Sequence, residues 1–248
     1  MLDALRRDYQ WVEVDIMAGG SRTPEFLLLN PFGQVPLMVL EDGRALAQSN
    51  AIILHQGEGT AWIPAGAWER AKMLEWLFWE QYSHEPYVAV ARFQRVYAGK
   101  TADEVESRLI ERGQAALARM ETALAGTDWL AGGQGATLAD LALVAYTRVA
   151  DEGGFEMAPY PNIRGWVGRT ETAFRIGSLL RLPAFRPFRG EVAVCHGLQR
   201  FDERLDGVGH EGDVEVLDGV LGRVISRDGG PARDGVGDDP LQGQGVVV

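Results

Sequence analysis

The sequence predicts a small α+β domain followed by an all-helical domain, and three observations lead to this prediction. Two short apolar runs on either side of the Asp-Gly pair at 42–43 indicate a β-hairpin. The segment 58–66 contains glycines and a proline, which interrupt regular structure and indicate a linker. From residue 67 to about residue 177, apolar residues recur at helical spacing. We therefore expect one domain at 1–57 and a second at 67–177.

The composition is that of an acidic globular protein. The chain has 248 residues, with seven Trp and nine Phe, which is enough large apolar surface for a real core. A net charge of −11 and the lack of Lys/Arg blocks argue against nucleic acid as a partner. The single cysteine, Cys195, excludes an intrachain disulfide and a cysteine-rich metal site. No apolar run reaches the roughly 18 residues of a membrane span, so we expect no membrane association. From the cysteine usage we expect no metal and a cytoplasmic location.

The chain opens with elements whose boundaries follow from local chemistry. Residues 2–8 read as the end of a helix, and 9–16 alternate apolar and polar residues like a strand. Thr23 followed by Pro24 predicts a short helix with Thr23 as its N-cap.

The stretch Asn30–Pro36 is a turn with Asn-Pro at its start and Gly33 at its centre. Pro36 then opens the first strand of the hairpin, where its missing N–H is tolerated. After the second strand come Gln48 and Ser49, at the point where a helix begins. The predicted order is therefore turn, hairpin, polar pair and helix.

The second half of the chain carries helix signals of its own. A long helix at 68–97 should be kinked or interrupted at Pro86. Thr101 and Thr137 are each followed three residues later by an acidic residue, which predicts a capping box and a helix start at both places. Pro161 lies at the start of a last helix that runs to about residue 174.

From residue 178 onward the character of the sequence changes. The segment 178–248 is rich in Gly, Asp and Val, with few aromatic residues beyond its start, and most of it lacks helical or strand periodicity. Such a composition buries too little apolar area to offset the entropy of ordering. We expect a mostly disordered tail, in which residues 214–220 could form a weak strand or hairpin. The alternative is a genuine extra subdomain.

The elements from residue 2 to residue 177 together resemble a known family. An Asn-Pro-x-Gly-x-Val-Pro loop, a hairpin and a Gln-Ser-x-Ala-Ile helix start occur in this order and spacing in cytosolic glutathione S-transferases of bacterial type. The resemblance implies a thioredoxin-like first domain, a helical-bundle second domain and a cytoplasmic homodimer active in detoxification. The family's first strand has no counterpart here, so we expect an N-terminally truncated member with an unrelated C-terminal tail. Without that strand, the edge of residues 12–16 should be left unpaired or shift beside the hairpin at 37–40.

The resemblance also implies the residues that bind glutathione. The main chain of Val35, held by a cis Pro36, would pair with the cysteinyl segment like an added strand. Gln48 and Ser49 would hold the γ-glutamyl end, and Gln34 would reach the glycyl end. The purely structural alternatives are a strand-entry turn at Pro36 and a helix cap at Ser49.

The implied reaction is the addition of the glutathione thiolate to a small hydrophobic electrophile. The family's thiol-activating Ser, Tyr or Cys follows the first strand, so we assign no catalytic residue and expect it upstream of Met1; Tyr9 comes too late. For five residues of the second domain the sequence leaves two alternative roles, a contact with the electrophile or a position in the core: Tyr82, His84, Tyr87, Arg92 and Phe93. A non-catalytic interaction module and an inactive fragment are the alternative functions.

Overall fold

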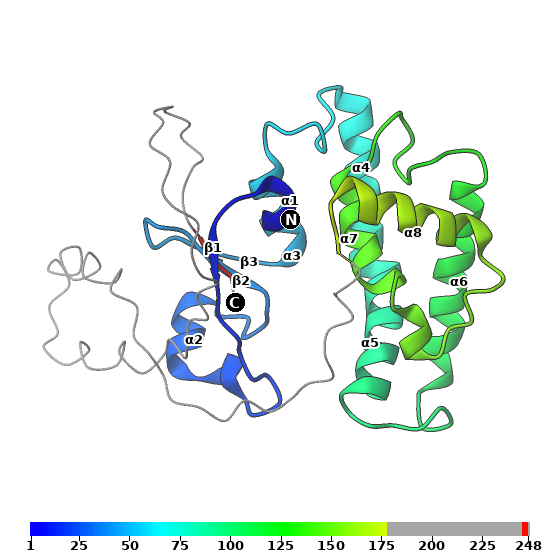
Figure 1. Ribbon diagram of the computed structural model, residues 1–248. Coiled ribbons are helices and arrows are strands. Elements are labelled where there is room, and N and C mark those ends of the chain that lie inside the picture. Colours follow the sequence, from blue (N-terminus) through cyan, green and yellow to red (C-terminus); the bar gives the residue numbers. More distant parts are fainter. Residues whose placement is uncertain (178–244, 248) are drawn as a thin grey trace, which may run out of the picture. The chain divides into compact units, whose positions relative to one another are not determined.

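The computed structural model describes residues 1–177 and 245–247 (Figure 1). Among them the chain forms two compact units, one comprising 2–52 and 245–247, the other Met1 and 53–177. The division falls inside helix α3 (Ser49–Gly57), a few residues before the predicted linker at 58–66. Most of the predicted tail, including Cys195 and residues 214–220, lies outside the described residues.

The first unit contains every strand of the described residues. Its elements, with α3 continuing into the second unit, are α1 (Leu2–Leu5), β1 (Tyr9–Trp11), the 3₁₀ turn η1 (Gly20–Arg22), α2 (Pro24–Leu29), β2 (Leu37–Val39), β3 (Ala45–Ala47), α3 (Ser49–Gly57) and β4 (Gly245–Val247).

The strands form one sheet in the order β1-β4-β2-β3, with β4 at the red end of the chain lying beside β1 and β2 (Figure 1). β4 is parallel to β1 and antiparallel to β2, and β2 and β3 form the antiparallel hairpin. Two expectations are therefore corrected. Residues 245–247 are a strand and not part of a disordered tail, and the strand expected at 9–16 is limited to Tyr9–Trp11, which pairs with residues 245–247. The reason is that an extended segment from the far end of the chain satisfies both sheet edges.

Local signals account for the other elements of this unit. The Thr23 hydroxyl accepts a bond from the Phe26 N–H, and Pro24 occupies the first turn of α2, both as predicted. Gly43 has a φ of 81° in the hairpin turn, which a residue with a side chain rarely adopts. Phe26 from α2 packs against Val12 and Leu37 in a small buried core.

The second unit is a bundle of helices (Figure 1). Its elements are α4 (Ala67–Trp79), the π-helical turn η2 (Glu80–His84), α5 (Glu85–Val96), α6 (Ser107–Leu124), α7 (Leu138–Thr147), the 3₁₀ turn η3 (Ala150–Gly153) and α8 (Pro161–Ala173).

The long helix predicted at 68–97 is interrupted as expected. Pro86 lies in the first turn of α5, and the π-helical turn precedes it. A proline clashes with the carbonyl four residues earlier, here that of Tyr82, so the wider turn accommodates the ring. None of the helices among the described residues is both long enough and apolar enough to cross a membrane.

The two predicted capping boxes have different outcomes. Thr137 and Asp140 form the complete box at the start of α7, and the buried Asp140 also accepts bonds from the Leu130 N–H and the Trp166 indole. Burial raises the pKa of Asp140 and these hydrogen bonds oppose the rise. Thr101 donates to the carboxylate three residues on, but no helix begins there; α6 starts at Ser107. The intervening turn instead places Val105 in the core, where it is buried.

Candidate functional site

The loop between α2 and β2 is held from inside by Asn30. Its side chain is almost fully buried; the amide donates to the Gln34 carbonyl over 2.6 Å, and its oxygen accepts from the Phe32 N–H over 3.2 Å. The Gly33 N–H donates to the Asn30 carbonyl over 2.9 Å. One buried side chain thus fixes the direction of the main chain on both sides of Gly33.

The loop ends at the Val35–Pro36 bond, which is cis, as the resemblance implies. Val35 is exposed, whereas Leu37, the first residue of β2, is fully buried. The chain therefore passes from solvent into the core within two residues. Gln34 and Val35 lie on the solvent side of this transition, and both residues are exposed.

Gln48 and Ser49 follow directly after β3, at the other end of the same hairpin. Gln48 has a φ of 72°, uncommon for a residue other than glycine, and its carbonyl accepts the first bond of α3, from Ile52. Its side-chain amide lies 3.4 Å from the side-chain oxygen of Gln34. Both Gln48 and Ser49 are exposed. The structure thus brings Gln34 and Gln48 together although fourteen positions separate them.

This arrangement has the chemistry to bind a small polar peptide. The loop offers main-chain N–H and C=O groups at Val35, which can pair with an extended segment. The N-terminus of α3 is the positive end of the helix dipole, which favours a carboxylate. Ser49 contributes a hydroxyl, and Gln48 an amide that both donates and accepts.

Arg22 is a neighbour of the loop that sequence reasoning missed. Its guanidinium donates to the Phe32 carbonyl over 3.3 Å. It also lies against Gly33, where an added Cβ would collide with it. Gly33 has a φ of 61°, which a residue with a side chain rarely adopts, so the backbone conformation favours glycine there. An arginine at the end of the 3₁₀ turn η1 carries no recognisable signal in the sequence, because its proximity to the loop depends on how η1 packs.

Of the five second-domain candidates, two have structural roles. His84 is fully buried, and its Nε2 lies 2.9 Å from the Thr147 hydroxyl. That hydroxyl donates its only proton to the Leu143 carbonyl over 2.7 Å, so it accepts from a protonated Nε2. Burial lowers the pKa of His84 to about 3, which keeps the ring neutral. Arg92 is buried and forms a 2.7 Å ion pair with Glu152.

The other three candidates reach solvent to different degrees. Tyr82 is 82% exposed, Phe93 is 38% exposed and stacks on Tyr97, and Tyr87 is half-buried. The contact of these three side chains with an electrophile stays a prediction.

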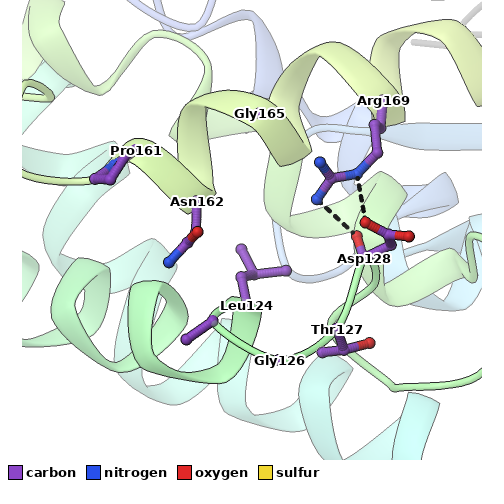
Figure 2. A pocket seen from close by; sticks show the side chains of 9 residues that line it. Leu124, Gly126, Thr127, Asp128, Pro161, Asn162, Gly165 and Arg169 are labelled. Atoms are coloured by element: carbon purple, nitrogen blue, oxygen red, sulfur yellow. Dashed lines mark hydrogen bonds and ion pairs between the residues drawn. The ribbon is translucent and has the colours of Figure 1, made fainter.

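A shallow polar depression of about 430 Å³ lies between the end of α6 and α8 (Figure 2). The one cation in its lining, Arg169, donates to the Asp128 carbonyl over 3.1 Å and lies 3.6 Å from the Asp128 carboxylate. Its charge is therefore already balanced by a neighbour. None of the predicted glutathione-binding residues lines this depression. Within 1–177 and 245–247, no three His, Cys, Asp or Glu side chains are placed to hold a metal ion.

Comparisons with known proteins agree with the resemblance. Residues 1–57 match the family model "Glutathione S-transferase, N-terminal domain", and residues 103–169 match "Glutathione S-transferase, C-terminal domain". A glutathione S-transferase of Silene vulgaris is 33% identical over 146 residues, which cover 54% of this chain and 66%, just under two thirds, of that protein. The disulfide-bond oxidoreductase YfcG of Escherichia coli is 28% identical over 72% of this chain and 86% of its own length. A crystal structure of a glutathione S-transferase from Pseudomonas fluorescens Pf-5 is 44% identical, covers 69% of this chain and 86% of that chain, and has a TM-score of 0.67.

Proposed function

The chain belongs to the glutathione S-transferase family, and we propose that it binds glutathione at the hairpin and adds the thiolate to a small hydrophobic electrophile. The observation that supports this function most directly is the exposed residue Val35, which lies before a cis Pro36 on the hairpin whose other end carries Gln48 and Ser49. Gln34 and Gln48 approach each other across the two ends of this hairpin.

The cysteinyl residue of glutathione is proposed to lie along Val35. Its main-chain N–H and C=O would pair with those of Val35, as in strand addition. The buried Asn30 supports this role, because it fixes the carbonyl of Gln34 immediately before the binding segment. A main-chain contact of this kind does not depend on the side chain at position 35, which explains why an exposed valine is acceptable there.

The γ-glutamyl end is proposed to lie at the start of α3. Its carboxylate would accept bonds from the Ser49 hydroxyl and the first N–H groups of the helix. Its ammonium would donate to the side-chain oxygen of Gln48. Gln48 is neutral, so this bond lacks the strength of a pair between an ammonium and a carboxylate.

The glycyl end is proposed to reach Gln34 and Arg22. Gln34 provides an amide, and the Arg22 guanidinium, which donates to the Phe32 carbonyl of the same loop, provides a positive charge for the second carboxylate. In a chain with a net charge of −11, a local cation matters for an anionic ligand.

In the proposed reaction, a carbon–sulfur bond forms between the cysteinyl sulfur and the electrophile, while the thiol proton is released. A leaving group departs with its bonding electrons, or, in an addition, a proton is taken up. The reaction needs a donor near the sulfur that stabilises the thiolate. We assign this role to none of the described residues.

The remaining proposals concern organisation. We retain domains at 1–57 and 67–177, which agrees with the family model that spans 1–57. We propose a cytoplasmic homodimer that acts in detoxification. Exposed aromatic side chains on α4 and η2 support an association surface: Trp68, Phe78 and Tyr82. Light scattering after size-exclusion chromatography tests for the dimer.

The first test of the function is binding of the full chain to immobilised glutathione, with elution by free glutathione. Isothermal titration then gives the affinity for glutathione. The single substitutions Ser49→Ala and Arg22→Gln should each lower this affinity. Conjugation is measured with an activated aryl chloride. A parallel assay with a small disulfide separates conjugation from disulfide exchange, the activity in the name of the Escherichia coli relative. A folded chain that is not retained by glutathione would contradict the proposal.

A further inference from the structure

The turn between β2 and β3 contains a pair of residues with a reactivity of its own. Asp42 is followed by Gly43, and no other Asp-Gly pair occurs in the sequence of residues 1–177. In such a pair the glycine nitrogen can attack the side-chain carboxyl carbon of the aspartate and close a five-membered ring. Glycine has no Cβ to obstruct this ring. The turn therefore carries a site at which the chain can modify itself.

The conformation of the turn leaves the pair accessible to water. The Gly43 N–H donates to the Leu40 carbonyl and the Leu40 N–H donates to the Arg44 carbonyl, both over 2.9 Å. With a φ of 81° at Gly43, this is the pattern of a type I turn followed by a left-handed residue. The side chain of Asp42 is 49% exposed. While the turn is closed, however, the single N–H of Gly43 is occupied by Leu40.

Arg44 holds both oxygens of the Asp42 carboxylate. Its main-chain N–H donates to Oδ1 over 3.1 Å, and its Nε donates to Oδ2 over 2.7 Å. The first bond is the local bond of an Asx turn, and the second belongs to an ion pair. A neutral carboxyl group accepts a nucleophile far more readily than a carboxylate, and the guanidinium pairs with the carboxylate. Arg44 thus opposes ring closure through both the orientation and the charge of this group.

We propose that Asp42 is a site of spontaneous conversion to isoaspartate and that Arg44 restrains this modification. The Gly43 nitrogen forms a bond to the side-chain carboxyl carbon of Asp42, and one water leaves, made from the carboxyl hydroxyl and the amide proton. Water then adds to one carbonyl of the cyclic imide. Cleavage at the former side-chain carbonyl restores aspartate, whereas cleavage at the main-chain carbonyl gives isoaspartate. The two steps together release one water and consume one.

The modification lengthens the turn by one main-chain atom, because the chain then runs through the former side chain of Asp42. The length of a hairpin loop sets the register of its strands. Here that register pairs Val39 with Ala45 and Leu37 with Ala47. Isoaspartate at position 42 therefore disturbs the pairing of β2 with β3 from the turn inward.

Peptide mapping of the full chain tests the role of Arg44. After incubation and digestion, chromatography with electron-transfer mass spectrometry separates isoaspartate from aspartate at each site. Arg44→Gln removes the ion pair and keeps the main-chain bond, while Arg44→Lys keeps the charge and is the matched control. Asp42 should convert about two- to fivefold faster in the glutamine variant than in the parent chain, the factor that an exposed ion pair can supply. The lysine variant should stay close to the parent.

Four further Asp-Gly pairs, which lie outside the described residues, give an internal reference in every sample: 206–207, 218–219, 228–229 and 234–235. Their rates should not change when Arg44 is replaced. In urea, where the turn is open, Asp42 should convert about tenfold faster or more than in buffer and at a rate similar to these four pairs. Asp42→Glu is the negative control, because its side chain would have to close a six-membered ring, and position 42 should then stay unmodified.

Equal rates at Asp42 in the folded parent chain and in folded Arg44→Gln would overturn the protective role of Arg44. Arg44 is 74% exposed, so the core does not depend on it, and Arg44→Met repeats the comparison in a second variant. Isoaspartate at the four reference pairs but not at Asp42 in urea would overturn the site itself. None of these readouts involves glutathione, so the outcome is independent of the proposed function.

Discussion

The side-chain amide of Asn30 donates a 2.6 Å hydrogen bond to the carbonyl of Gln34, immediately before the cis Val35–Pro36 bond. The donor is almost fully buried, whereas Gln34 and Val35 are exposed. The conformation of an exposed binding segment is therefore determined by a residue that no ligand can touch.

Replacing Asn30 tests this relationship. Asn30→Ala leaves the Phe32 N–H and the Gln34 carbonyl without their partner, at a cost of about 1–3 kcal/mol in the free energy of unfolding. Asn30→Asp keeps the acceptor for Phe32 but replaces the donor to Gln34 with a buried carboxylate that repels the carbonyl. We expect glutathione affinity, measured by titration calorimetry, to fall in both variants. Leu28→Ala, at an exposed position of α2, is the control, and an equal loss in this variant would argue against the loop as the cause.

Gln48→Glu tests the proposed contact with the γ-glutamyl ammonium. The new carboxylate would form a charge-assisted bond, and we expect glutathione to bind more tightly by about 1 kcal/mol at low salt. Gln48→Ala should weaken binding by a similar amount. The two changes share a backbone position with positive φ, so their difference reports on the side chain alone. If Glu and Ala give the same affinity, Gln48 does not contact the ammonium.

His84 predicts a pH dependence of stability. Its pKa in the folded chain is lowered to about 3 from an ordinary value of 6.5 because it is buried. The unfolded chain therefore binds a proton below pH 6.5 that the folded chain refuses, and stability falls as the pH decreases from 6.5 towards 3. Between pH 7 and pH 5 this single group should cost about 2 kcal/mol. Urea unfolding at both pH values, for the parent chain and for His84→Leu, measures the difference; identical pH profiles would refute the prediction.

Two helical glycines give a matched pair for packing. At Gly113 in α6 an added Cβ would collide with the ring of Phe155, which is buried. Gly113→Ala should therefore destabilise the chain by about 1–3 kcal/mol. Gly168 in α8 has open space around it, so Gly168→Ala should instead stabilise by about 0.5–1 kcal/mol through helix propensity. Thermal unfolding compares the two; a loss of stability in both would mean that the collision is not the cause.

Signals contained in a few neighbouring residues predict much of this fold. The cap at Thr23, the hairpin turn at Gly43, the box at Thr137 and the interruption at Pro86 each follow from hydrogen-bonding or steric rules over four or five positions. The same rules are wrong at Thr101, where only one of the two bonds of a box forms, from the Thr101 N–H to the Glu104 carboxylate, and no helix begins. Local bonding could not reveal that the following residues are used to bury Val105 instead.

The sequence by itself determined the family, the order of turn, hairpin and helix, and the candidate residues Gln34 to Pro36 with Gln48 and Ser49, because each depends on chemistry between near neighbours. The tertiary structure decided the rest. It placed residues 245–247 inside the sheet, brought the Arg22 guanidinium to the Phe32 carbonyl and buried His84 against Thr147. These contacts join distant parts of the chain, and their free energy comes from edge pairing and packing that no local pattern encodes.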